Sequence, residues 1–368
     1  MMKEPIYVTQ PVLPKLDDFI PYLEQIWKNK VLTNCGPLHQ QLEQELCDYL
    51  GVEYISLFNN GTIALVTALQ ALNLSEGEVI TTPYTFVATA HSIVWNKLTP
   101  VFVDIDPVTS NIDPKKVEQA ITEKTVAIMP VHCYGIACDV EGLQKIANEH
   151  HLKLIYDAAH AFGVKFQGQS LLNYGDVSVI SFHATKVFNT FEGGAIVCHS
   201  LEMKQRIDRL RNFGIVNETT IDDISLNGKL SEVHAALGLL QLKTIDQTLF
   251  ARKKIDSHYR ELLKDVEGVL CIQRSITDTD NYSYFPIVIS QPYPLTRDQL
   301  FEKLKERNIF ARKYFYPIMT DLDIYKKFKS NTPNAQILSE KVLCLPMYPT
   351  LKDEDVQQIV CVIKDGSK

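Results

Sequence analysis

The chain has 368 residues, of which 45% are hydrophobic and 22% are charged. Its formal net charge of −7 gives no electrostatic reason to expect nucleic acid or an anionic membrane surface as a partner. No run approaches the roughly 18 consecutive apolar residues of a membrane-spanning helix, and the first residues lack the apolar core of a secretory signal, so we expect a cytoplasmic protein.

Strand-like and helix-like patterns alternate over the first half of the chain. A helix with Leu38, Leu42 and Leu46 on one face precedes a strand at 54–58, and a Gly-Thr turn at 61–62 opens a second helix. The next predicted strands are 78–83, 99–106, 125–132, 152–157 and 176–180, and the intervening helices are 85–97, 113–122 and 139–151. This alternation predicts βα units and a mainly parallel sheet with helices on both faces.

The pattern changes from residue 231 onward. Residues 231–266 contain no proline and no turn signal, which predicts a long connecting helix. A strand-like run at 282–289 and a helix-like run at 296–309 follow. We therefore expect an α/β fold with two domains. Residues 1–240, with the N-terminal segment, form the large domain, and residues 241–368 form the connecting helix and a smaller C-terminal α/β domain.

Polar and aromatic side chains follow four of the predicted strands. In open α/β sheets, ligands bind beyond the carboxyl ends of the strands, so these side chains are expected at one edge of one sheet. The set offers an anion cradle at a helix start, an aromatic ring, a carboxylate, a histidine and a lysine. Its members are Gly61, Thr62, Phe86, Asp157, His160, Ser181, His183 and Lys186.

Each group in this set has a defined chemical use. Backbone N–H groups at the helix start of Gly61 and Thr62 suit a phosphate. A lysine shielded from water, as expected for Lys186, is less basic and more nucleophilic toward an aldehyde. A buried carboxylate keeps a pyridine nitrogen protonated, and an aromatic ring stacks on the pyridine face. Pyridoxal phosphate (PLP) requires all four groups. Each residue by itself also has an ordinary structural explanation, such as helix capping, core packing or a solvated charge. The prediction therefore depends on all of these residues occurring together in this order along the chain.

The cysteines point to neither disulfides nor a metal. All eight are scattered without a disulfide-like spacing, so we expect reduced core thiols. The closest cluster is His132, Cys133 and Cys138, and no second Cys/His pair follows it at zinc-like spacing. We therefore expect no metal site.

Six ordered motifs resemble the nucleotide-sugar aminotransferase family called DegT/DnrJ/EryC1/StrS over almost the whole chain. They are NNGTIAL, TPYTFVATAHSI, PVHCYG, YDAAHAFG, SFHATKVFNTFEGGA and NGKLSEVHAALGLLQL. The resemblance implies the type I fold of PLP enzymes and a homodimer with two shared active sites.

The resemblance also implies a role for each residue of the set. Lys186 binds the cofactor covalently and moves a proton between the amino donor's Cα and the cofactor, and Asp157 pairs with the pyridinium nitrogen. His160 lies near the phenolic oxygen, and Phe86 stacks on the ring. The phosphate is held by Gly61, Thr62 and Ser181, with Asn227 or Lys229 of the partner subunit.

The resemblance further implies transamination, since members that dehydrate the sugar carry histidine in place of the lysine at position 186. L-glutamate is the implied amino donor. Members acting at C3 of the sugar commonly carry Tyr-Pro before the lysine motif, whereas His183-Ala184 here resembles members acting at C4. The implied substrate is a nucleotide-linked 4-keto-6-deoxy-hexose, with dTDP as the expected nucleotide, for O-antigen or surface polysaccharide biosynthesis.

Some finer assignments stay open at this point. The predicted substrate contacts are His183 and the aromatic stretch ARKYFYP at 311–317, which contains Arg312 and Lys313, with packing as an equal alternative. Arg312 or Lys313 could meet either a diphosphate or the glutamate carboxylate. The alternative functions are a C3-acting aminotransferase on a 3-keto-6-deoxy sugar nucleotide and a PLP-binding regulatory protein without turnover.

Overall fold

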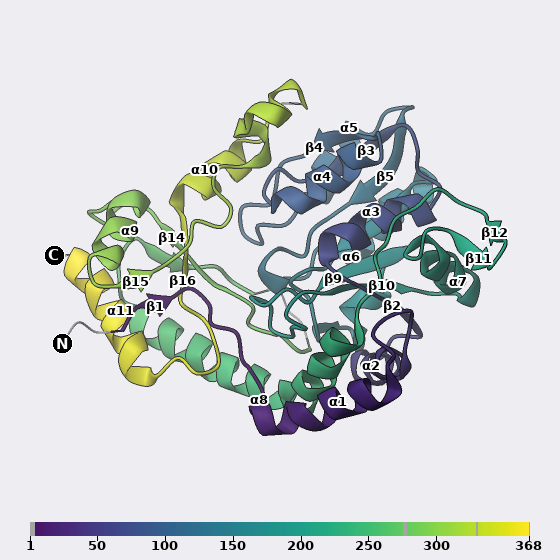
Figure 1. Ribbon diagram of the computed structural model, residues 1–368. Helices are drawn as coiled ribbons and strands as arrows, with labels where there is room; N and C mark the ends of the chain where they lie inside the picture. The colour runs from purple at the N-terminus through teal and green to yellow at the C-terminus, as the bar shows by residue number, and fades with distance from the viewer. Residues whose placement is uncertain (1–3, 275–277, 329, 368) are drawn as a thin grey trace.

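The computed structural model of the protein describes residues 4–274, 278–328 and 330–367 (Figure 1). A seven-stranded sheet in the order β2-β10-β9-β6-β5-β3-β4 forms the centre of the larger part of the molecule. Its strands are β2 (Tyr54–Phe58), β3 (Glu78–Thr81), β4 (Thr99–Phe102), β5 (Thr125–Met129), β6 (Lys153–Asp157), β9 (Val177–Ser181) and β10 (Gly194–Cys198).

This sheet is parallel except at one strand. β10 runs antiparallel to both of its neighbours, β2 and β9, and the other neighbouring pairs are parallel. The reason is local. The chain passes from β9 to β10 through residues 182–193, which form no crossover helix, and a short connection between adjacent strands reverses the chain direction. The mainly parallel sheet predicted from the alternation is confirmed.

Helices cover both faces of the sheet. Along β6, Ile155 points into one apolar cluster and its neighbours Leu154 and Tyr156 into the other, as the two-residue period of a strand requires. One cluster includes residues of α3 (Gly61–Ala71), α4 (Val87–Trp95) and α7 (Leu201–Leu210). The other includes residues of α1 (Leu16–Asn29), α2 (Pro37–Leu50), α5 (Pro114–Ala120), α6 (Val140–Glu149) and α8 (Glu232–Leu263).

Helix α8 runs for 32 residues along the bottom of the view in Figure 1 and confirms the predicted long helix. It leads to a three-stranded antiparallel sheet of β13 (Val269–Cys271), β14 (Phe285–Ile289) and β16 (Val342–Leu345). Around this sheet lie α9 (Arg297–Lys305), α10 (Pro333–Lys341) and α11 (Asp353–Gly366). The predicted domain boundary at 240/241 falls inside α8, and that division stays a prediction.

The N-terminal segment contacts the C-terminal part of the chain. Strand β1 (Ile6–Tyr7) pairs in parallel with β15 (Ile309–Phe310), which differs from its expected grouping with the large domain. The remaining short elements are β7 (Lys165–Phe166), β8 (Gln169–Ser170), β11 (Ile215–Asn217), β12 (Thr220–Ile221) and the 3₁₀ turns Cys133–Gly135, Leu171–Asn173, Met319–Asp321 and Asp323–Phe328. Within the ranges that the structure describes, no helix has both the length and the apolar character needed to cross a membrane.

Candidate active site

A cavity of about 260 Å³ lies at the carboxyl ends of β6 and β9. It brings together most of the strand-end residues predicted from the sequence, among them Gly61, Thr62, Phe86, Asp157, His160, Ser181, His183 and Lys186. Asn60 and Thr85, which also follow predicted strands, line it too, whereas Asn59 and Tyr84 do not. These side chains come from different βα units, and they meet because parallel strands end at the same edge of a sheet.

One wall of the cavity is the start of α3. Asn60 Oδ1 accepts the Ile63 N–H at 2.8 Å, and the Asn60 carbonyl accepts the Ala64 N–H. The preceding N–H groups, those of Gly61 and Thr62, have no partner among the described residues and lie at the cavity. A Cβ on Gly61 would lie 3.1 Å from Ser181 Cβ, so glycine lets the helix start approach the end of β9. This wall therefore suits an anion.

Asp157, the last residue of β6, is buried, and its carboxylate is held at both oxygens. Thr89 Oγ1 donates to Oδ2 at 2.7 Å, and the Ala159 N–H donates to Oδ1 at 3.1 Å. Burial raises the pKa of Asp157, while these two hydrogen bonds and the charge of Lys186 act against the rise. A carboxylate in this setting is stabilised further by a cationic ring nitrogen beside it.

Lys186 lies in the loop between β9 and β10, where its backbone N–H donates to the His183 carbonyl at 2.8 Å. Its Nζ lies 6.0 Å from the centre of the Tyr284 ring. Burial lowers the pKa of Lys186 to about 8, although the charge of Asp157 opposes this shift. A sizeable fraction of the amine is therefore neutral and nucleophilic close to neutral pH.

His160 is held as a neutral ring. Its Nδ1 accepts the Tyr134 N–H at 3.2 Å, and burial lowers the pKa of His160 far below the ordinary value. A neutral imidazole that accepts at Nδ1 carries its hydrogen on Nε2, so Nε2 is a donor. The ring also stacks against Phe315, with an interplanar angle of 1°. These contacts favour the predicted place of His160 beside a phenolic oxygen.

Phe86 and His183 stand at the open side of the cavity. Phe86 precedes α4 and is 58% exposed, so its ring is free to cover a planar ligand. His183 Nε2 lies 3.5 Å from Glu192 Oε1, and both side chains are about half exposed. The pair presents polar groups toward whatever enters the cavity.

Several residues of the cavity were missed by the sequence analysis. Thr89 does not line the cavity but holds Asp157 there, and it carried a signal, because it lies one helical turn after Thr85 on the face of α4 that meets the end of β6. Tyr284 carried none, because it reaches the cavity from the C-terminal part of the chain. Tyr314 and Phe315 belong to the aromatic stretch 311–317 that was predicted to contact the substrate, and both line the cavity. Glu192 and Thr185 also line the cavity.

The other predicted site residues do not reach this chain's own cavity. Lys313 Nζ lies 2.6 Å from Asp298 Oδ1 on α9, and Arg312 is exposed. Lys229 Nζ donates to Asn212 Oδ1 at 2.6 Å, and the Asn227 carbonyl accepts from the Asn59 side chain. The roles of these four residues stay predictions.

The groups that do meet fit PLP. The anion wall at α3 suits its phosphate, Asp157 suits its ring nitrogen, His160 suits its phenolic oxygen, and the Lys186 amine suits its aldehyde. Phe86 is an open aromatic ring at the same cavity.

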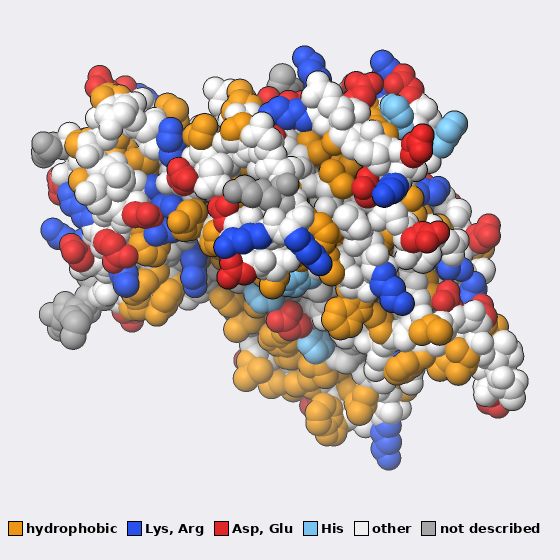
Figure 2. Space-filling view, turned by 90° about the horizontal axis from the view of Figure 1, so that it is seen from above, with side chains coloured by type: hydrophobic (Ala, Val, Ile, Leu, Met, Phe, Trp, Pro, Cys, Tyr) orange, Lys and Arg blue, Asp and Glu red, His pale blue; other side chains and the backbone are white. Residues whose placement is uncertain are grey.

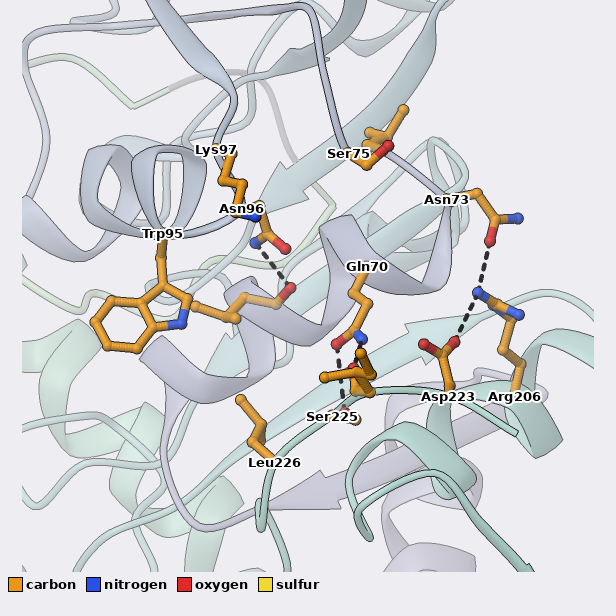
Figure 3. Close-up of a pocket in the computed structure, with 13 residues that line it drawn as sticks. Gln70, Asn73, Ser75, Trp95, Asn96, Lys97, Arg206, Asp223, Ser225 and Leu226 are labelled. Atoms are coloured by element: carbon orange, nitrogen blue, oxygen red, sulfur yellow. Dashed lines mark hydrogen bonds and ion pairs between the residues drawn. The ribbon is translucent and has the colours of Figure 1, made fainter. Parts of the chain in front are cut away.

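A larger hollow of about 670 Å³ lies beside α3 and the end of α4 (Figure 3). Arg206 lies in the wall of this hollow and links two other lining residues, with its Nη2 2.6 Å from Asn73 Oδ1 and 3.3 Å from Asp223 Oδ2. Amide, hydroxyl and apolar side chains, including Trp95 and Ile224, make up most of the rest. No predicted site residue lines this hollow in the described structure, so we place the active site at the smaller cavity.

Known proteins match this chain over almost its whole length. The model of the DegT/DnrJ/EryC1/StrS aminotransferase family matches residues 15–364. The chain is 58% identical over 366 residues to a dTDP-4-amino-4,6-dideoxy-D-glucose transaminase of Shigella dysenteriae, covering 99% of this chain and 100% of that protein.

Solved structures share the fold over nearly the whole chain. DesI, solved in the presence of its TDP-sugar product, superposes with a TM-score of 0.95 at 33% identity, covering 100% of this chain and 94% of the other. Spr1654 of Streptococcus pneumoniae, solved in PLP and PMP forms, is 26% identical, with 99% and 98% coverage and TM-scores of 0.91 and 0.92. The type I PLP-enzyme fold predicted from the motifs is confirmed, and the chain belongs to the DegT/DnrJ/EryC1/StrS aminotransferase family.

Proposed function

We propose that the protein transfers the amino group of L-glutamate to C4 of a dTDP-4-keto-6-deoxy-hexose. The products are dTDP-4-amino-4,6-dideoxy-D-glucose and 2-oxoglutarate, made in the cytoplasm for O-antigen or another surface polysaccharide. The observation that carries this proposal is the 58% identity, over both full lengths, with a transaminase named for that amino sugar. The half-buried Lys186 and the buried Asp157 in one cavity supply the chemistry that the name requires.

PLP is the cofactor, and when bound it supplies an electron sink for the negative charge that develops at the donor carbon. Gly61, Thr62 and Ser181 would hold its phosphate, and Asp157 would keep its ring nitrogen protonated. The neutral His160 would donate from Nε2 to its phenolic oxygen. Walls of buried apolar and aromatic side chains exclude water, which strengthens each of these polar contacts.

Lys186 is the acid and base of the reaction. With a pKa of about 8, its neutral and protonated forms are both populated near the working pH of a cytoplasmic enzyme. The neutral amine removes a proton from Cα of glutamate, and the ammonium returns a proton to C4 of the sugar in the second half-reaction. A group that serves in both directions is most effective when its pKa lies near the ambient pH.

Substrate contacts at the cavity mouth follow from the same geometry. His183 and Glu192 offer a donor and an acceptor to sugar hydroxyls from positions that remain half exposed. Lys313 contacts a substrate only after leaving Asp298, and the exposed Arg312 only by turning inward. We therefore favour His183 and Glu192 for the sugar.

We also propose a homodimer with shared active sites, in which Asn227 or Lys229 of the partner subunit completes the phosphate site. Two features support it. Lys229 does not line the cavity of its own chain, and several large apolar side chains are exposed to solvent. Trp95 is 76% exposed and Ile224 is 93% exposed at the edge of the large hollow. Figure 2 shows hydrophobic side chains gathered in the lower centre of one face of the molecule rather than spread evenly. Such patches mark contact surfaces.

Product analysis tests the proposed reaction. Purified enzyme is incubated with PLP, L-glutamate and 4-keto or 3-keto 6-deoxy sugars linked to dTDP, UDP or GDP, and the products are identified by NMR. We expect a 4-amino product from the dTDP-4-keto sugar. Amination only at C3 would favour the C3-acting alternative. A PLP-loaded protein that aminates no member of the panel would favour the regulatory alternative.

A further inference from the structure

Cys35 lies outside the candidate active site, just before α2, and its sulfur contacts a buried cation. Arg211 Nη2 lies 3.2 Å from Cys35 Sγ, and the Arg211 side chain is 2% exposed. The same guanidinium is fixed by the Leu57 carbonyl at 2.8 Å, so it cannot turn away from the thiol without losing a buried hydrogen bond. Cys35 itself is half-buried.

A buried histidine four residues further along the chain interacts with the thiol. His39, on the first turn of α2, is 1% exposed, and its Nε2 lies 3.1 Å from Glu43 Oε1. Its other ring nitrogen, Nδ1, is buried without a conventional hydrogen-bond partner in the described structure. Interaction with this imidazole and with Arg211 lowers the pKa of Cys35, although burial acts against the shift. A buried nitrogen beside a thiol is placed to exchange its proton.

Two carboxylates hold Arg211 and a neighbouring lysine in place. Glu43 Oε1 lies 2.9 Å from Arg211 Nη1, and Glu43 Oε2 lies 3.0 Å from Lys204 Nζ. Asp208 pairs with both cations, at 2.9 Å from Arg211 and 2.8 Å from Lys204. Arg211 Nη2 is the nitrogen that contacts both Asp208 and the sulfur, so this network fixes the position of the cation beside the thiol.

Two further charged residues, Glu232 and Lys229, lie close to the thiol. Glu232, from α8, accepts the backbone N–H groups of Leu38 and His39, so the start of α2 already has a carboxylate partner. The thiolate is therefore stabilised by Arg211 and His39 and not by the helix end. Lys229 adds a positive charge near Cys35, from the segment before α8.

We propose that Cys35 is a reactive thiolate and a modification site for hydroperoxides. The sulfur attacks the terminal oxygen of the hydroperoxide. An S–O bond forms, the O–O bond breaks, and the leaving oxygen takes a proton from protonated His39. The products are a cysteine sulfenic acid and water or an alcohol, so sulfur loses two electrons and the peroxide gains them. Thiolates held by cations are the cysteines most susceptible to this reaction.

Alkylation of the native protein tests the thiolate. Iodoacetamide is added at several pH values from 5 to 10, and the modified cysteines are quantified by peptide mass spectrometry. The exposed Cys361 serves as the reference within the same molecule. We expect Cys35 to reach half of its maximal rate at a lower pH than Cys361. A profile at or above that of Cys361, or labelling of Cys35 only after denaturation, would overturn the proposal.

Peroxide oxidation tests the modification itself. Hydrogen peroxide is added with dimedone, which traps sulfenic acid, and the adduct is located by mass spectrometry. Cys35 should carry the adduct, Cys35→Ser should lose it, and Cys361→Ser should retain it. His39→Gln should slow adduct formation about tenfold, if the thiol pKa rises by about one unit. Absence of a Cys35 adduct in the wild-type protein contradicts the proposal whether or not the variants fold.

Discussion

Thr89 Oγ1 donates a hydrogen bond to Asp157 Oδ2 over 2.7 Å, from the first turn of α4 to the end of β6. A second hydroxyl stands behind it, since Thr85 Oγ1 lies 2.8 Å from Thr89 Oγ1. All three side chains are buried. Buried hydroxyl groups therefore hold the carboxylate in one orientation. Their hydrogen bonds stabilise its ionised form and offset part of the free-energy cost of burying the charge.

We predict that Thr89→Val lowers turnover by roughly tenfold, because a buried carboxylate loses one hydrogen bond worth about 1.5 kcal/mol. Loss of this donor raises the pKa of Asp157 further, so the acid-side transition in the absorbance of bound PLP should move to higher pH. Thr89→Ser keeps the hydroxyl and should restore both values. Identical pH titrations of the Val and wild-type proteins would show that Thr89 does not act through Asp157.

Asp157→Asn keeps the side-chain size and removes the charge that faces the ring nitrogen. We expect the variant to fold, because the amide can still accept from Thr89, and to bind PLP while turning over roughly 10² to 10⁴ times more slowly. Steady-state kinetics with glutamate provide the measurement. Turnover within a few-fold of the wild-type value would remove Asp157 from the mechanism.

Lys186 should capture PLP with a pH dependence set by its environment. Only the neutral amine attacks an aldehyde, and burial lowers the pKa of Lys186 to about 8 from the ordinary 10.5. The capture rate of PLP-free enzyme, followed by absorbance, should therefore rise with pH, reach half of its maximum near pH 8 and level off at higher pH. In Asp157→Asn the plateau should begin at lower pH, because the charge of Asp157 raises the pKa of Lys186.

The control for this experiment is Lys186→Ala, which should give no borohydride-stable adduct at position 186. Peptide mapping after reduction identifies the modified lysine in the wild-type protein. An adduct on a different lysine, or a rate that still rises steeply at pH 10, would contradict the assignment of Lys186.

Mixed dimers test the shared active site. Lys186→Ala subunits are combined with subunits that carry both Asn227→Ala and Lys229→Ala, each parent protein being inactive. If Asn227 and Lys229 act across the interface, hybrid dimers contain one site with an intact lysine and an intact partner segment, so activity should return to about a quarter of the wild-type value in an equal mixture.

Two controls make this result interpretable. Hybrid formation is measured by mass spectrometry of differently tagged subunits. Each of the two parent homodimers is checked for folding by its thermal unfolding. Demonstrated hybrids without recovered activity, or a fully active monomer, would rule out the sharing of sites.

The sequence by itself determined the layered fold and the centre of the active site. Alternating apolar runs and helix starts are local properties, and they predicted the strands of the large sheet. Because parallel strands end at one edge, residues as far apart as Gly61 and Lys186 could be placed together without coordinates. The motif order then identified the family, since each motif kept its residue types and spacing.

Only the tertiary structure decided which distant side chains complete the sites. Tyr284 enters the cavity from the C-terminal part of the chain, and no local pattern around it predicts that contact. Arg211 meets Cys35 across 176 positions, and Lys313 pairs with Asp298 instead of the cavity. Such contacts follow from how separate elements pack against one another. Periodicity determines which face of a helix is buried, and packing determines what that face meets.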